Sequence, residues 1–141
     1  MQRDRIATAR MWLDNAAMDL ALAEKIAADF APRACFHAQQ CAEMALKAAL
    51  IALADDHPRT HVGGRLLEEL EGLDVAIPPE IAAAANRLDL YYVGSRYPDA
   101  LGGADPRRVL AERDATGAAE LADSVLGFAR RLVDEEAAAA G

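Results

Sequence analysis

The chain has 141 residues, of which 53% are hydrophobic and 27% charged, and its formal net charge is −8. This length and composition suit a folded chain with a full core, so we expect a single domain over residues 1–141. The negative charge and the low aromatic content of 5% exclude a wide nucleic-acid-binding surface, because the phosphate backbone would meet like charge and few stacking rings.

The sequence also argues against membrane insertion and secretion. No run of 18 residues is apolar enough to span a bilayer, and the N-terminal stretch MQRDRIATARMW has no apolar signal region. Cys35 and Cys41 lie on one expected helix with their side chains about 240° apart, so they cannot pair with each other. We therefore expect a reduced, cytoplasmic protein with no membrane partner.

Apolar residues recur at helical spacing along almost the whole chain. The first helix is expected over about residues 3–28, and a second begins at a Pro and covers about residues 32–54. The loop DDHPRTHVGG leads to a short helix, RLLEELEGL, and a medium helix then runs from IPPE to about Gly94. A Gly/Pro loop precedes the last helix, which begins within residues 106–113. These elements predict an all-α protein, an antiparallel up-and-down bundle of four to five helices.

The second helix carries a row of polar side chains although its sequence, CFHAQQCAEMALKAALIAL, is apolar on every side. Gln40, Glu43 and Lys47 fall within an arc of about 60° on the helix, on the same face as the largest apolar residues. A helix that is apolar all round is buried all round, and buried charges need partners. We therefore expect Glu43 and Lys47, which are four residues apart, to form an ion pair.

Two interpretations of this polar row stay open. It is either a structural ion-pair network under partial cover, or the lining of a polar site at the seam of a two-fold dimer. Further partners are expected from Asp19 in the first helix, and from Arg96 and Asp99 in the loop after the fourth helix.

Several pieces of the chain together resemble the HEPN family, the higher eukaryotes and prokaryotes nucleotide-binding domain. They are WLDNAAMDLALAEKI, CFHAQQCAEMALKAAL, the pair Thr60–His61 and the sequence RYPD at residues 96–99, in this order over nearly the whole chain. The resemblance implies a bundle of four to five helices that commonly dimerises. It also implies a minimal nucleotidyltransferase as partner, because the genes of HEPN proteins are often found next to the gene of such an enzyme, as a two-gene toxin–antitoxin-like pair.

Many members of this family are metal-independent ribonucleases that use an Arg followed by four to six residues and a His. The chain departs from this motif, since Leu101, Gly102 and Gly103 stand where that His would follow Arg96. Without this imidazole the family's proton acceptor and donor is missing. We expect no catalytic residue of this kind, and the alternative is a degenerate metal-independent ribonuclease that uses Arg96 at the dimer seam.

The predicted ligand site combines the loop after the fourth helix with the polar row. An Arg can hold a phosphate and a neighbouring Tyr can stack on a ligand. The predicted set is Arg96, Tyr97, Asp99, Lys47, Glu43, Gln40 and His61. His61 is either a helix cap or a hydrogen-bond donor at the mouth of the site. The resulting prediction is a homodimer that binds a nucleotide, another phosphate-bearing ligand or RNA.

We predict neither a metal site nor a cofactor. His37 and Cys41 have the spacing of two ligands on one helix, but no second pair of ligands follows, and a closed zinc site needs four. Cys35 and Cys41 are expected to be small core residues. A purely structural helical dimer, in which the polar row only fixes the register, is the third interpretation.

Overall fold

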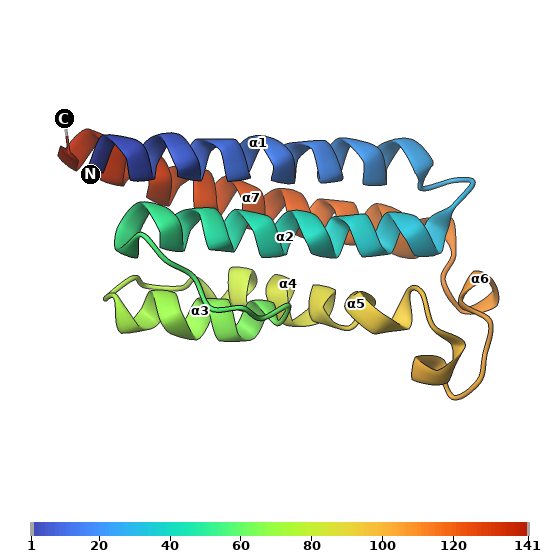
Figure 1. Cartoon of the computed structure of the whole chain (residues 1–141). Coiled ribbons are helices and arrows are strands. Elements are labelled where there is room, and N and C mark those ends of the chain that lie inside the picture. Colours follow the sequence, from blue (N-terminus) through green and yellow to red (C-terminus); the bar gives the residue numbers. More distant parts are fainter. Residues whose placement is uncertain (1, 141) are drawn as a thin grey trace.

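The computed structural model describes residues 2–140, and every regular element in this range is a helix (Figure 1). This confirms the all-α fold class predicted from the sequence. The elements are α1 (Gln2–Ile26), α2 (Ala31–Ala54), α3 (Gly63–Gly72), α4 (Pro79–Asp89), α5 (Tyr91–Gly94), a 3-10 helix η1 (Pro98–Leu101), α6 (Pro106–Val109) and α7 (Glu112–Ala140).

The long helices run alternately in opposite directions (Figure 1). α2 returns along α1, α4 and α5 together run back along α2, and α7 ends beside the start of α1. α3 is a short additional helix that packs on α2 and α4. The result is the expected up-and-down bundle, in which α2 has neighbours on most of its sides.

The packing of α2 follows from the size of its side chains. Its alanines before Ala54 are buried, and so are many alanines of α1 and α7, the two helices that contact α2 most extensively. Small side chains let helix backbones approach closely, whereas larger ones fill the space between more distant elements. Leu46 and Leu50 of α2 are fully buried and belong to the same apolar cluster as Leu66, Leu70 and Leu88 of α3 and α4.

Two expected elements differ in detail from the structure. The helix expected to run to Gly94 is divided into α4 and α5, and the one-turn helix α6 precedes the last long helix. The loop between α5 and α6 turns at Gly102 and Gly103, whose φ angles of 64° and 87° lie in the left-handed region that favours glycine. Within the described residues, none of the helices combines the length and the hydropathy needed to cross a bilayer.

The start of α3 is held by a carboxylate from α4. No side chain caps α3 from its own N-cap position, but Asp89 accepts hydrogen bonds from the backbone N–H groups of Gly63 (2.6 Å) and Gly64 (3.2 Å). Burial raises the pKa of the Asp89 carboxyl, while these two hydrogen bonds lower it in part. A side chain from another helix thus satisfies two donors that a helix terminus leaves open.

Replacing Asp89 tests this cross-helix cap. We expect Asp89→Ala to lower the free energy of unfolding by about 1 kcal/mol, the usual cost of losing a helix cap. Asp89→Asn should lose less, because one oxygen still accepts a hydrogen bond. Urea unfolding followed by circular dichroism measures both, with Glu68→Ala on the exposed face of α3 as the control. Equal stability of the Ala variant and the wild type would show that the cap contributes nothing.

Candidate functional site

A buried ion pair lies at the centre of the polar row on α2. Lys47 Nζ lies 3.0 Å from Glu43 Oε2, and the side chains are only 9% and 7% exposed. The ion pair predicted from the spacing is therefore confirmed. Both charges are already covered within a single chain, without a second protomer.

Glu43 has two further partners besides Lys47. The side-chain amide of Gln39 donates to Glu43 Oε1 at 3.2 Å, and Nδ1 of His61 lies 3.2 and 3.3 Å from the two carboxylate oxygens. Gln39 also donates to the backbone oxygen of His61, and Gln40 donates to Gln39 at 2.7 Å. Such a set of partners is what a buried carboxylate requires.

Two interactions hold the imidazole ring of His61 in place. Its Nδ1 atom is hydrogen-bonded to Glu43, and the face of the ring stacks on Tyr92 with 4.2 Å between the ring centroids and 28° between the planes. An ionised carboxylate can only accept hydrogen bonds, so His61 Nδ1 is the donor in this pair. The loop before α3 is thereby attached to both α2 and α5.

Arg96 lies over three aromatic rings. Its guanidinium carbon is 4.2 Å from the centroid of the Phe36 ring, 4.9 Å from that of Tyr92 and 5.0 Å from that of Tyr97. These are cation–π distances. Nε and Nη2 of Arg96 also donate to the backbone oxygen of Tyr92, at 3.0 and 2.6 Å. An Arg has five N–H donors, so three of them stay available for a ligand.

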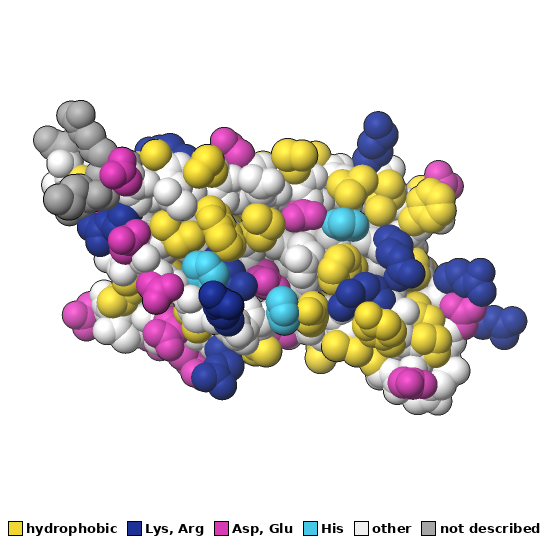
Figure 2. Space-filling view, in the orientation of Figure 1, with side chains coloured by type: hydrophobic (Ala, Val, Ile, Leu, Met, Phe, Trp, Pro, Cys, Tyr) yellow, Lys and Arg dark blue, Asp and Glu magenta, His cyan; other side chains and the backbone are white. Residues whose placement is uncertain are grey.

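These side chains form one continuous surface feature, here called the arginine–aromatic row. It consists of His61, Tyr92, Arg96, Phe36 and Tyr97. A second imidazole–carboxylate pair adjoins it, since His37 lies edge-on to Phe36 and its Nδ1 is 2.9 Å from Asp19 of α1. Figure 2 shows histidine, basic and hydrophobic side chains together on this face of the molecule.

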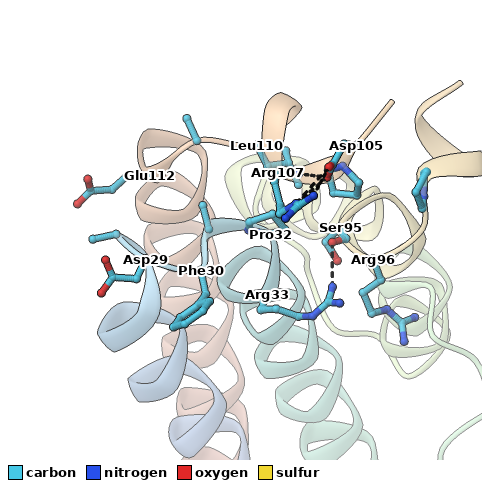
Figure 3. A pocket seen from close by; sticks show the side chains of 15 residues that line it. Asp29, Phe30, Pro32, Arg33, Ser95, Arg96, Asp105, Arg107, Leu110 and Glu112 are labelled. Carbon is cyan, nitrogen blue, oxygen red and sulfur yellow. Dashed lines mark hydrogen bonds and ion pairs between the residues drawn. The ribbon is translucent and has the colours of Figure 1, made fainter. Parts of the chain in front are cut away.

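A pocket of about 670 Å³ opens beside Arg96 at the N-terminal end of α2 (Figure 3). This volume is within the range of small-molecule sites. Arg33 and Arg96 line one side of it, while Asp29 and Glu112 lie on the other. The apolar part of the wall is formed by Phe30, Pro32, Pro98, Pro106 and Leu110.

The three arginines that line this pocket differ in whether their charge is paired with a carboxylate. Arg107 is bound to Asp105 at 2.6 Å, and its hydrogen bonds lower the pKa of that carboxyl to about 2. Arg33 donates only to the backbone oxygen of Ser95, at 3.3 Å. Because a backbone oxygen carries no full charge, Arg33 and Arg96 keep their positive charge for an anionic ligand.

The structure joins most of the predicted site residues but not in the predicted way. Gln40, Glu43, Lys47 and His61 form one network, and Tyr97 contacts Arg96. The expected partners of the polar row were wrong, because within residues 2–140 neither charge of the Glu43–Lys47 pair binds Asp19, Arg96 or Asp99. Asp19 contacts His37 instead, and Arg96 contacts the aromatic rings.

The structure also shows where the predicted site residue Asp99 lies, and it adds three residues that the sequence analysis did not single out. Asp99 is exposed on η1 and has no ion pair within residues 2–140. Gln39, Phe36 and Tyr92 were not predicted as site residues, yet they connect its parts. The contact of Gln39 with Glu43 could have been predicted, because the two residues lie one helical turn apart on α2. The contact between Phe36 and Tyr92 could not, because it joins two separate helices.

The two cysteines take the expected place in the core. Both are fully buried and unpaired, and burial is the main cause that raises the pKa of each thiol to about 12. They therefore stay protonated at neutral pH and have no nucleophilic role.

The buried ion pair can be compared with an exposed one of the same length. Glu43→Ala leaves Lys47 buried without a counter-charge, and we expect the free energy of unfolding to fall by about 3–5 kcal/mol. Asp134→Ala breaks the pair between Arg10 and Asp134, which is 2.9 Å long with side chains 47% and 64% exposed. It should cost less than about 1 kcal/mol. Denaturant unfolding of the two variants checks this, and similar losses would contradict the difference in burial.

Comparison with known proteins places this architecture in one family. The family description of the HEPN domain matches residues 9–132. A crystal structure of TT1696 from Thermus thermophilus superimposes with a TM-score of 0.81 and 36% sequence identity, covering 88% of this chain and 97% of that one. No protein with a curated description matches the chain.

A second solved structure agrees with the first. It is ST0689, described as an archaeal HEPN homologue, with a TM-score of 0.73 and 30% identity, covering 89% of this chain and 97% of that one. The matched range, the identities and the shared helical fold lead to one conclusion: the chain belongs to the HEPN domain family.

Proposed function

We propose that the chain is a non-catalytic HEPN module that binds a nucleotide, or another phosphate-bearing ligand, on the arginine–aromatic row. It acts as a homodimer and as the partner of a minimal nucleotidyltransferase in a toxin–antitoxin-like pair. The transferase partnership rests on the family resemblance stated above, and the ligand class rests on the geometry of the site.

The main support for this proposal is the way in which the guanidinium group of Arg96 is held in place. Three rings and one backbone oxygen hold its guanidinium in place, and three of its N–H donors are left over. A preorganised guanidinium loses little freedom on binding and suits the geometry of a phosphate. Arg33 and Arg96 both line the same side of the neighbouring pocket (Figure 3).

The local charge supports an anionic ligand in spite of the net charge of −8. Glu43, which binds His61 of the row, and Asp19, which binds the adjoining His37, each have a basic or imidazole partner within the protein. The positive charge of Arg96 has no acidic partner within the described residues. A small basic site can thus exist on an acidic protein.

The ribonuclease alternative has weaker support. The positions at which the family's His would follow Arg96 hold Leu101 and two glycines, and those glycines form a left-handed turn. A His at Gly102 or Gly103 would need the backbone conformation that side chains with a Cβ adopt at a cost. The loop is therefore built as a tight turn and not as a support for an imidazole.

Homodimer formation is supported by an exposed apolar stripe that overlaps the row at Tyr97. The stripe consists of Leu90, Val93 and Tyr97, which are exposed and lie three and four residues apart before, within and after α5. Exposed apolar side chains that cluster in this way are typical of interaction surfaces. An isologous contact through this stripe would bring the two copies of Arg96 near each other.

Nucleotide binding is tested by replacing Arg96. Arg96→Met keeps a side chain that packs on the rings but removes the charge, and we expect the affinity for ADP to fall about tenfold to a hundredfold. Arg108→Met, on the exposed side of α6, should bind like the wild type. Isothermal titration calorimetry with ADP and inorganic phosphate measures these affinities. A wild type without affinity for either ligand would overturn the proposal.

The dimer is tested by a charge in the exposed stripe. Val93→Glu should convert a dimer into a monomer, because it places two like charges at a two-fold contact. Val109→Glu carries the same change on an equally exposed Val of α6, outside the stripe, and should stay dimeric. Sedimentation equilibrium reads out the mass of each, and a monomeric wild type would rule out the proposed dimer.

A further inference from the structure

We propose that His61 makes the site selective for ribonucleotides. Its Nε2 accepts a hydrogen bond from the ribose 2′-hydroxyl of a nucleoside phosphate whose phosphate group binds Arg96. This inference rests on the proposed nucleotide binding and names the class of nucleotide that the site prefers.

The first step of the argument is the hydrogen-bonding state of His61. Glu43 accepts a hydrogen bond from Nδ1, so in the neutral imidazole the other ring nitrogen carries a lone pair and acts as an acceptor. The carboxylate that selects this state is 7% exposed and is itself fixed by Lys47 and Gln39. The buried network therefore places a proton on Nδ1, and Nε2 of the neutral imidazole is the acceptor.

The second step is the direction of this acceptor. Nδ1 points into the protein toward Glu43, while the His61 side chain as a whole is 56% exposed. Nε2 lies on the other side of the ring and has no hydrogen-bond partner among residues 2–140. An acceptor on a half-exposed imidazole thus stays open for a hydroxyl or N–H group of a ligand.

The third step is the position of His61 relative to Arg96. Both contact the same ring, since the His61 centroid is 4.2 Å and the Arg96 guanidinium carbon 4.9 Å from the centroid of Tyr92. The phosphate-binding group and the acceptor are therefore separated by no more than one aromatic side chain. In a nucleoside phosphate the ribose hydroxyls are one sugar away from the phosphate, which matches this separation.

The remaining phosphates then have a place on the other side of Arg96. Arg33 and the pocket at the N-terminal end of α2 lie there (Figure 3). A nucleoside diphosphate can thus span the site with its terminal phosphate at Arg33 and its sugar toward His61.

When a fixed acceptor binds a hydroxyl of a ligand, the analogue without that hydroxyl binds more weakly, because the acceptor then has no partner. One neutral hydrogen bond contributes on the order of 1 kcal/mol, which corresponds to about a threefold to tenfold difference in affinity. We therefore expect ADP to bind about threefold to tenfold more tightly than 2′-deoxy-ADP, which lacks the hydroxyl that distinguishes ribonucleotides, while 3′-deoxy-ADP should bind like ADP.

The experiment compares these three ligands by isothermal titration calorimetry on wild type and His61→Phe. A Phe at this position keeps an aromatic ring to stack on Tyr92, and Glu43 keeps Lys47 and Gln39 as partners. We expect the variant to bind ADP and the deoxy analogues with equal affinity, near that of the wild type for the weaker analogue. His57→Phe is the matched control, since that imidazole packs on Trp12 away from the row, and it should keep the preference.

Each outcome bears on one proposal or the other. If the wild type binds all three ligands equally and loses them with Arg96→Met, the role of His61 is wrong and nucleotide binding stands. If His61→Phe keeps the full preference for ADP, another group reads the hydroxyl and the inference is overturned. If no nucleotide binds to the wild type, the proposed function fails together with this inference.

Discussion

Because α2 lies among α1, α7 and the α3–α5 side of the bundle, each buried polar group on it must find a partner inside the protein. Burial of an unpaired charge costs several kcal/mol, so a central helix tolerates Glu43 and Lys47 only as a pair. Within the described residues no buried side-chain nitrogen or oxygen lacks a hydrogen-bond partner. The requirement is met with side chains of α2 itself and with His61, which the chain brings in from a loop.

The same requirement shapes the surface next to α2. His61 reaches Glu43 only if the loop before α3 lies against α2, and its ring then covers Tyr92. Tyr92 and Phe36 in turn support Arg96, which the short helix α5 carries to the same face. A buried charge and an exposed guanidinium are thus parts of one structure, so that a ligand site can be rigid although its residues come from three segments.

The loop that follows Arg96 departs from the ribonuclease motif of the family. Its backbone turns through Gly102 and Gly103 in left-handed conformations, where the family's ribonucleases would carry a His. Arg96 keeps its support from three rings, which does not depend on that turn. The proposed binding of an anion needs only the guanidinium, whereas acid–base chemistry needs an imidazole placed beside the reacting group.

Residue spacing was enough to predict the helices and their buried faces, the pair of Glu43 with Lys47 and the place of the two cysteines. All of these depend on positions along single helices, which the geometry of the α-helix fixes. The folded structure was needed to establish which partner Asp19 has, that His61 closes the network of Glu43, and that Arg96 rests on aromatic rings. These contacts join side chains far apart in the chain, and their choice depends on how the helices pack, which no local spacing encodes.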